Sequence, residues 1–336
     1  MNRRVGSWLR TLGGLGILAL LVRQLGSAAF LDGLRRIDAG TLLAGLGIGV
    51  LTTVCSAWRW CLVARGLGLR LPLGRAVADY YRALFLNAAL PGGVLGDVHR
   101  AVRHGRDAGD LGRGVQAVVL ERTAGQVVLL AVGAVVLAVR PSPALAPVGR
   151  AVGAPGALLA VAGAGVLGVA AAVLLRRRRR GGSGGRDGRA APSEARQALL
   201  GRAVWPGVTL ASAVVLAGYL GMFLLAARVA GARAPTAELV PLVVLALLAM
   251  AVPLNVGGWG PREGVAAWAF GAAGLGASLG LTTAVVYGVL AFAASLPGAG
   301  VLVVRWAGRP LRSGRRPQIQ LEERVLAEQG PPQRRA

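Results

Sequence analysis

The feature that most constrains this chain is the grouping of its apolar residues into long blocks with almost no charge. The blocks are roughly 20 residues long, which is the length that an α-helix needs to cross a bilayer core. Hydrophobic residues make up 54% of the chain, charged residues 15%, and the mean hydropathy is +0.59, well above the range of soluble domains. Because helices satisfy their own backbone hydrogen bonds in lipid, we expect an all-α polytopic transmembrane helical bundle.

The apolar blocks predict about eight crossings. The first block, 5–22, is interpreted as an uncleaved span because Arg23 interrupts the approach to the small residues at 26–29; a cleaved signal peptide is the alternative. The last apolar region, 264–306, is too long for one span and is divided near 277–281. The remaining predicted spans are approximately 41–64, 114–139, 154–175, 204–230 and 237–254.

Arginine supplies all 38 cationic side chains, and the formal net charge is +24. The arginines lie between apolar blocks rather than on one soluble domain, which argues against nucleic-acid binding and favours topology signals and contacts to anionic headgroups. With the N-terminus inside, 29 arginines fall in inner segments and 7 in outer segments. This bias predicts a multi-pass protein of a bacterial-type inner (cytoplasmic) membrane with both termini in the cytoplasm.

Charge and composition divide the chain into two transmembrane halves. A basic linker over 176–202 contains five consecutive arginines followed by Gly-Gly-Ser-Gly-Gly, a composition that cannot bury a core. It separates a first half, 1–175, from a second half, 203–307, and a disordered basic cytoplasmic tail is predicted over 308–336. The tail is too short for a soluble catalytic domain.

A first motif lies between the second and third predicted spans. The segment 80–100 begins amphipathic, turns apolar for too few residues to cross, breaks at proline and glycines, and resumes with charge, as expected of a re-entrant or broken helix. Glycines there allow close backbone approach, and free N–H groups at the restarted helix favour an anion. The candidate substrate-binding residues of this motif are Asn87, Pro91, Gly92, Gly93, Gly96, Asp97 and Arg100.

A second break follows the sixth predicted span, over 252–264, and the arginine distribution predicts that both breaks lie on the cytoplasmic side. Its candidate substrate-binding residues are Gly257, Gly258, Gly260, Arg262 and Glu263. Aligning the two Gly-Gly pairs brings Asp97 opposite the Arg262-Glu263 pair, so the halves are possible internal repeats that each donate one broken helix to a central site. Coincidence in a chain with 52 glycines is the alternative.

Charges also occur inside predicted spans. Arg59 has tryptophan neighbours near the inner end of the second span, and we expect it to snorkel to the interface, with a substrate contact as the alternative. Glu121 and Arg122 begin the third span and point to different helix faces, so each is expected to pair with another group. For Arg122, a structural contact and a lipid-phosphate contact both remain open. Gly45-x-x-x-Gly49 permits close helix contact, within the chain or between chains.

We expect no metal and no cofactor. Asp97, His99 and His104 form the only cluster that resembles a metal or acid-base site. The two histidines are five residues apart and do not share a helix face. Solvated loop histidines are therefore the expected interpretation.

Three motifs in order resemble the transmembrane family named after lysylphosphatidylglycerol synthase, also called flippase-like. They are Asn87-x-x-Leu90-Pro91-Gly92-Gly93-x-x-Gly96-Asp97-x-x-Arg100, Glu121-Arg122, and Gly257-Gly258-x-Gly260-x-Arg262-Glu263-Gly264. The resemblance covers nearly the whole chain and implies a lipid-translocating membrane region. In the synthases a soluble aminoacyltransferase domain follows this region, and we do not carry the synthase activity over because that domain has no counterpart here.

These observations predict a membrane lipid-handling protein, with flippase-like translocation of a phospholipid or other anionic lipid. Asn87, Arg100, Arg122 and Arg262 would contact an anionic headgroup, while Asp97 and Glu263 would pair with those arginines or recognise a cationic headgroup. One alternative is a membrane-embedded transferase acting on a polyprenyl-phosphate or phospholipid, with Asp97 or Glu263 as base. Another is an accessory partner of an envelope-synthesis enzyme.

Overall fold

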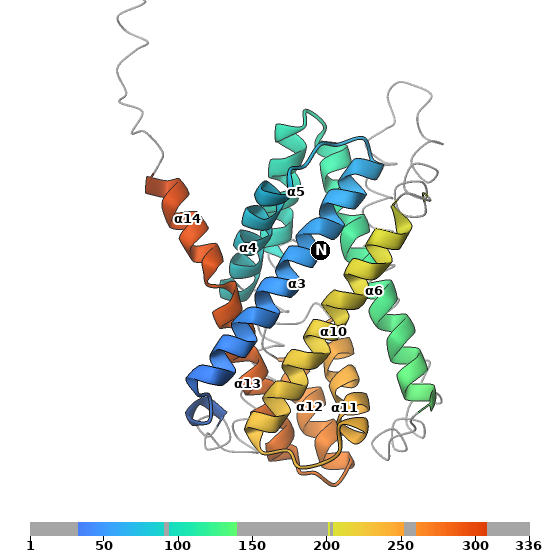
Figure 1. The fold of residues 1–336 in the computed structure, drawn as a ribbon, viewed down its shortest axis with the longest axis vertical. Coiled ribbons are helices and arrows are strands. Elements are labelled where there is room, and N and C mark those ends of the chain that lie inside the picture. Colours follow the sequence, from blue (N-terminus) through green and yellow to red (C-terminus); the bar gives the residue numbers. More distant parts are fainter. Residues whose placement is uncertain (1–32, 91–93, 140–200, 202–203, 252–259, 308–336) are drawn as a thin grey trace, which may run out of the picture. The chain divides into compact units, whose positions relative to one another are not determined.

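The computed structural model describes residues 33–90, 94–139, 201, 204–251 and 260–307, and this part of the chain is helical with no strand (Figure 1). The predicted first span, the span at 154–175, the basic linker and the tail lie outside the described residues. The chain divides into two compact units, Met1–Val301 and Leu302–Ala336. The arrangement that follows is that of the first unit.

Within the described ranges, four helical stretches are long and apolar enough to cross a membrane, which confirms a polytopic helical membrane protein. They are α3 (Ala39–Gly66), α6 (Leu111–Val139), α10 (Trp205–Ala230) and the stretch Ala277–Val304, which contains α13 (Ala277–Ser295) and most of α14 (Pro297–Ala307). The predicted spans at 41–64, 114–139 and 204–230 therefore have helical counterparts with nearly the same bounds.

Short-range chemistry sets several helix ends. The Asp38 carboxylate caps α3 by accepting a hydrogen bond from the Thr41 backbone N–H at 2.7 Å. Gly231, with φ +102°, adopts the left-handed conformation that ends α10. Pro261 begins α12 (Pro261–Ala272) at a position where its missing N–H costs no helical hydrogen bond.

Helices α3 and α10 run antiparallel along their whole length. Near the start of α3, Arg36 Nη1 donates to the carbonyl of Ala230 at the end of α10, at 2.8 Å. Near the other end, Arg59 Nη1 donates to Ser212 Oγ at 3.0 Å. The end of α3 therefore lies beside the beginning of α10 at one end of the bundle. At the opposite end of the bundle, the start of α3 lies beside the end of α10.

The first glycine motif lies at the turn of a helical hairpin. Helix α4 (Leu73–Ala89) and helix α5 (Leu95–Asp107) pack against each other on either side of the break, as the broken-helix prediction requires. At 1.5 Å per residue, α5 is about 20 Å long, less than the roughly 30 Å of a bilayer core. Gly96 makes the packing possible, because a Cβ there would lie 2.1 Å from the carbonyl oxygen of Ala83.

The second motif also joins the arms of a hairpin, which corrects part of the predicted topology. Helix α11 (Thr236–Ala249) and helix α12 pack together, and at about 21 and 18 Å each is too short to cross. The segments at 237–254 and 264–277 were predicted as two separate crossings, because hydropathy registers apolar length but not a reversal of direction. They instead enter and leave the bundle at the same end.

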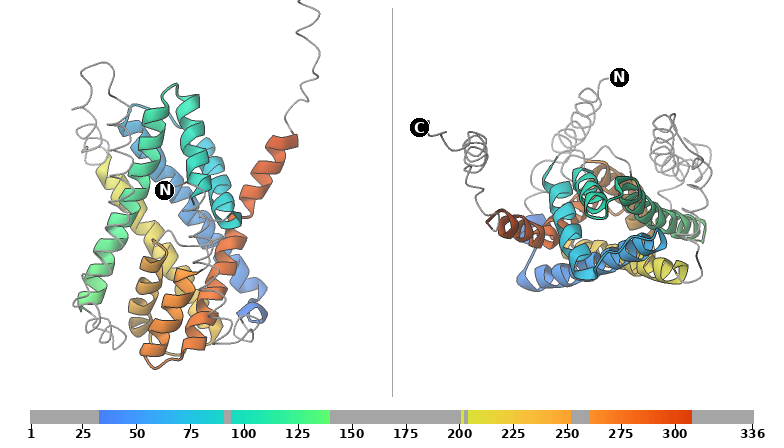
Figure 2. Two further views of the ribbon diagram at one scale, coloured as in Figure 1. Left: turned by 180° about the vertical axis from the view of Figure 1, so that it is seen from behind. Right: turned by 90° about the horizontal axis from the view of Figure 1, so that it is seen from above.

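The two hairpins enter from opposite ends of the bundle (Figures 1 and 2). The first hairpin connects the end of α3 to the beginning of α6, and the second connects the end of α10 to the beginning of α13. Because α3 and α10 are antiparallel, these two connections lie at opposite ends. The expectation that both glycine motifs belong to loops on the same side of the membrane is therefore wrong.

Helix α13 packs against both α10 and α3. Phe223 of α10 stacks on Tyr287 of α13 with ring centroids 4.6 Å apart. On its other side, α13 brings Leu290 and Ala294 against the small-residue motif Gly45-x-x-x-Gly49 of α3. The motif therefore serves a contact within the chain.

Candidate functional site

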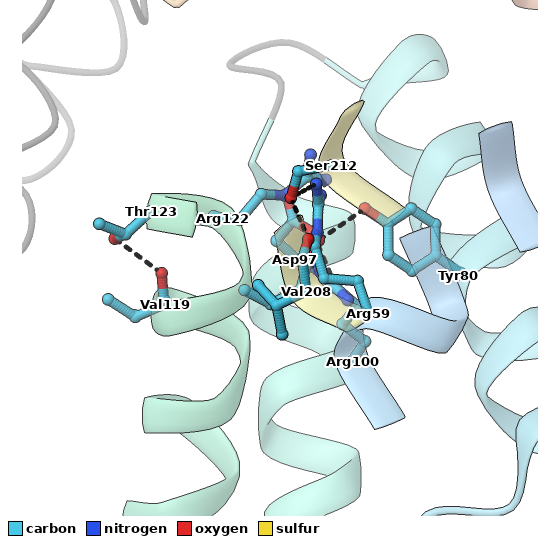
Figure 3. A network of polar contacts seen from close by, with 10 residues as sticks. Arg59, Tyr80, Asp97, Arg100, Val119, Arg122, Thr123, Val208 and Ser212 are labelled. Carbon is cyan, nitrogen blue, oxygen red and sulfur yellow. Dashed lines mark hydrogen bonds and ion pairs between the residues drawn. The ribbon is translucent and has the colours of Figure 1, made fainter. Parts of the chain in front are cut away.

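A buried network of charged side chains joins the first hairpin to α3, α6 and α10 (Figure 3). Glu121 of α6 is its centre and is fully buried. The Glu121 carboxylate accepts hydrogen bonds from Arg59 Nε at 3.0 Å and from Arg100 Nη2 at 2.6 Å. Tyr80 of α4 donates to the same carboxylate at 3.3 Å. One carboxylate on α6 thus contacts side chains from three other helices, α3, α4 and α5.

Asp97, in the first turn of α5, is the second acidic member of the network. Its carboxylate accepts from Arg100 Nε and from Arg122 Nη2, both at 2.9 Å, and from Asn87 Nδ2 at 3.1 Å. Burial raises the pKa of this carboxyl, but Arg122 and Arg100 outweigh burial and hold the pKa below its usual range. Asp97 is therefore ionised at neutral pH.

Asn87 fixes the turn of the first hairpin. Its Oδ1 accepts a hydrogen bond from the Gly96 backbone N–H at 2.7 Å, while its Nδ2 donates to Asp97. One amide side chain at the end of α4 thus satisfies an otherwise unbonded N–H at the start of α5. The asparagine and glycine of the motif act together in shaping the backbone break.

Arg100 is held between two aromatic rings as well as two carboxylates. Its guanidinium carbon lies 4.7 Å from the centroid of the Trp60 ring and 4.4 Å from that of Tyr80, and the side chain is fully buried. Its Nη1 has no hydrogen-bond partner, and the aromatic faces offer it favourable contact instead. Arg100 is therefore fixed in place and is not a free ligand-binding cation.

The second hairpin carries its own buried ion pair. Arg262 Nε donates to Glu263 Oε1 at 2.9 Å, and the Glu263 carboxylate also accepts from the Gly260 backbone N–H at 2.7 Å. Gly260 has φ +130°, a conformation that side chains rarely tolerate. The Arg262 guanidinium lies over the ring of Tyr287, 5.0 Å from its centroid. This pair anchors α12 to α13.

Two adjoining cavities lie between the hairpins. The larger, of about 410 Å³, has Arg59, Asp97 and Arg122 in its wall, and the smaller, of about 200 Å³, has Arg262. The two cavities share these lining residues: Leu84, Asn87, Tyr219, Met250, Tyr287 and Ala291. The charges of the first hairpin and the arginine of the second thus border one continuous region of the bundle.

Arg122 is more exposed than the other two arginines of the network, Arg59 and Arg100. Its side chain is 37% exposed, although it lies deep among helices, since the exposed part faces the larger cavity. Among its hydrogen-bonding atoms, Nη2 is engaged by Asp97, and Nε is buried with no partner. A guanidinium has five N–H donors, so Arg122 retains donors for a ligand.

The structure brings the described candidate residues into two groups around these cavities. The first contains Asn87, Gly96, Asp97, Arg100, Glu121 and Arg122, and the second contains Gly260, Arg262 and Glu263. Pro91, Gly92, Gly93, Gly257 and Gly258 lie outside the described residues. The expectation that Glu121 and Arg122 pair with other groups is confirmed.

Two interpretations of single residues are wrong. Arg59 is buried and pairs with Glu121 instead of snorkelling to the interface, because a carboxylate one helix away satisfies it. His104 is buried in α5 against the edge of the Trp60 ring, with centroids 5.3 Å apart, whereas His99 is exposed. Within the described residues, no group of three or more His, Cys, Asp or Glu side chains could hold a metal ion.

Sequence reasoning missed two residues of the site. Ser212 of α10 donates to the carbonyl of Val208 and accepts from Arg59, and nothing in its apolar surroundings marks it. Gln126 lies one turn beyond Arg122 and lines the larger cavity. A polar amide in an apolar span could have been identified from the sequence, but the nearby charges of Glu121 and Arg122 drew attention instead.

Comparison with known protein families agrees with this arrangement. Residues 7–298 match the family described as Lysylphosphatidylglycerol synthase TM region. The match contains both hairpins and helices α3, α6, α10 and α13. Comparisons with curated proteins and with solved structures gave no match. Because the family match spans most of the chain and includes every motif that predicted it, the chain belongs to the lysylphosphatidylglycerol synthase transmembrane family, a family of lipid-related integral membrane regions.

Proposed function

We propose that this protein binds the anionic headgroup of a membrane lipid in the larger cavity and moves that lipid between leaflets. The observation that carries the proposal is Arg122, a guanidinium deep in the bundle that borders a cavity and retains unused donors. A charge at such a depth is costly unless it is paired or has a function. Asp97 accepts a hydrogen bond from only one nitrogen of Arg122, so an incoming phosphate would accept hydrogen bonds from the remaining donors of Arg122.

The walls of the cavities suit a lipid. Besides the charged wall, the larger cavity is lined by apolar side chains of several helices, among them Leu129 of α6, Leu216 of α10 and Leu247 of α11. Such a lining accommodates acyl chains while the polar wall holds the headgroup. Opposed half-length hairpins that border one cavity region are also the arrangement expected of a transporter that opens to each side in turn.

The transferase alternative is less well supported. Asp97 accepts hydrogen bonds from two arginines, and Glu263 is paired with Arg262 and with a backbone N–H. The two arginines favour the ionised form of Asp97 and make it a weak base, and both oxygens of the Glu263 carboxylate are occupied by hydrogen bonds. Neither candidate base is therefore arranged to take a proton from a substrate, which supports transport over group transfer.

We also propose that the end of the bundle where the first hairpin enters faces the cytoplasm. The connections around that hairpin hold exposed arginines such as Arg70, Arg75 and Arg106. At the opposite end, the α10–α11 connection and its flanks hold Arg228 and Arg233. The positive-inside rule favours this orientation, and together with the predicted first span it would put both termini in the cytoplasm.

Reconstitution tests the proposed transport. The purified protein is placed in liposomes that contain acyl-labelled fluorescent phosphatidylglycerol, and a membrane-impermeant quencher added outside reports how much labelled lipid reaches the outer leaflet. In protein-free liposomes the quencher reaches only the labelled lipid in the outer leaflet, which is about half of the total. We expect the protein to raise the quenched fraction above this half. Loss of this excess in Arg122→Gln, with Arg106→Gln unchanged, is the expected pattern, since Arg106 is an exposed arginine at the end of α5. Protein-free behaviour of the wild type would refute the transport proposal.

A further inference from the structure

His104 is a buried titratable group outside the proposed headgroup site. It lies in the last turn of α5 and is only 4% exposed. Its ring meets the Trp60 ring of α3 edge-on, with centroids 5.3 Å apart. Within the described part of the chain, the Nε2 atom of His104 is enclosed by protein and has no hydrogen-bond partner. A neutral ring suits this place better than an imidazolium, which would bring an unpaired N–H and a full charge into the interior.

A small polar pocket connects this ring to the surface. The pocket has a volume of about 50 Å³ and lies between the start of α4 and the end of α5, away from the two larger cavities. Besides His104, its wall contains Arg70, Arg75, Asp79 and Asp107. Arg75 and Asp107 pair with each other at 2.5 Å, and their side chains are 45% and 39% exposed. Protons can therefore reach His104 from this end of the bundle without passing through the headgroup site.

The charged side chains around His104 come from three segments. They are Arg70 before α4, Arg75 and Asp79 of α4, and Arg100, Arg103 and Asp107 of α5. Helix α3 meets the ring through the uncharged Trp60, and the first turn of α6 packs Gly114 against α5 while its own charges, Asp110 and Arg113, pair with each other. Burial has the largest effect and lowers the pKa of His104. The ring is therefore neutral at pH 7.5 and gains its proton below about pH 6.5, the ordinary pKa of histidine.

A chain of contacts leads from His104 to the proposed headgroup site. The Trp60 ring that packs against His104 also lies beside the guanidinium of Arg100, whose Cζ is 4.7 Å from the ring centroid. Arg100 is one helical turn before His104, so an imidazolium there would repel it. Arg100 donates to Asp97 at 2.9 Å, and Asp97 in turn accepts from Arg122 in the wall of the larger cavity. A positive charge on His104 therefore acts against the packing that fixes Asp97 and Arg122.

From these contacts we infer that His104 is a pH sensor whose protonation loosens the first hairpin and weakens the headgroup site. The imidazolium leaves Trp60 and moves toward the polar pocket, where Asp79 and Asp107 supply negative charge. Its departure removes one side of the packing around Arg100 and makes local opening of α5 easier. The inference rests on the headgroup site proposed above and names how that site is regulated.

Hydrogen exchange of α5 tests the sensor without any lipid. The purified protein in an uncharged maltoside detergent is deuterated at pH 7.5 and at pH 5.5, and mass spectrometry follows peptides from 95–107. The wild type is compared with His104→Gln at each pH, so that the intrinsic pH dependence of exchange cancels. An opening that lets His104 titrate at its ordinary pKa of about 6.5 becomes more frequent by a factor of up to about 11 at pH 5.5, but of only about 1.1 at pH 7.5.

We expect the ratio of wild-type to His104→Gln exchange rates in α5 to rise about five- to tenfold between pH 7.5 and pH 5.5. The matched control is His99→Gln, because the sequence contains two histidines and His99 is exposed on the same helix. This control should keep the acid response of the wild type. If His104→Gln does not fold, His104→Phe replaces it, since phenylalanine keeps a ring against Trp60 and cannot be protonated.

Lipid movement tests the link from the sensor to the site. In liposomes buffered at the same pH on both sides, the wild type should lose most of its excess quenching between pH 7.5 and pH 5.5, whereas His104→Gln should keep it. The inference is overturned if the exchange ratio does not change with pH, if His99→Gln abolishes the acid response, or if wild-type lipid movement is the same at both pH values. Absence of movement at pH 7.5 would instead refute transport alone, because the exchange experiment contains no lipid.

Discussion

Replacing Glu121 by glutamine should destabilise the protein more than any surface charge change. The substitution keeps the shape of the side chain but removes the negative charge to which Arg59 and Arg100 donate at 3.0 and 2.6 Å. The glutamine amide would keep one oxygen acceptor, but its NH2 group would face a guanidinium; Arg100 would still have the carboxylate of Asp97, whereas Arg59 would have no carboxylate partner. The result is a buried guanidinium without a counter-charge.

The expected cost follows from the burial of the pair. Glu121 and Arg100 are fully buried, and removing one partner of a buried ion pair costs about 3–5 kcal/mol. That is a large part of the 5–15 kcal/mol that is typical of folded domains. The matched control is Asp107→Asn, whose partners Arg75 and Arg103 lie at the surface, and for which a loss of about 0–1 kcal/mol is expected.

The free energy of unfolding can be measured by titrating the detergent-solubilised protein with SDS and following tryptophan fluorescence. We expect a double-mutant cycle of Glu121→Gln with Arg59→Met to be strongly non-additive, because the second change removes the unpaired charge left by the first. A loss below about 1 kcal/mol for Glu121→Gln, equal to that of the surface control, would falsify the claim that this network holds the hairpin in place.

Three further outcomes are expected. Gly96→Ala should lower thermal stability and lipid movement, because its Cβ would lie 2.1 Å from the Ala83 carbonyl oxygen. The control Gly74→Ala, in open space on α4, should melt like the wild type. Equal melting temperatures for the two variants would contradict the close packing of the first hairpin. Gly260→Ala should lower the free energy of unfolding in the SDS titration by about 1 kcal/mol or more, since φ +130° is strained for alanine. An unchanged free energy of unfolding would show that this turn can relax. A cysteine introduced at Ser183 in the basic linker should resist membrane-impermeant thiol reagents in intact cells, and rapid labelling would reverse the proposed orientation.

The sequence by itself determined the class of the protein and the chemistry of its motifs. Uncharged apolar blocks of membrane-spanning length can satisfy their backbones only as helices, so the bundle followed from hydropathy. Proline and glycine at 91–93 predicted a broken helix, because neither continues a helix well and both follow from local sterics. The order of three motifs likewise sufficed for the family, since family membership is a property of the sequence.

Only the tertiary structure decided where those motifs lie and what they contact. Hydropathy counts apolar residues and does not register that α11 and α12 reverse direction, so the sequence placed both glycine motifs on one side, whereas the hairpins enter from opposite ends. The pairing of Arg59 with Glu121 joins residues 62 positions apart, and no local pattern encodes such a contact. The same is true of the position of Arg122 beside Asp97 and the larger cavity, because ion pairing depends on which side chains from separate helices meet in space.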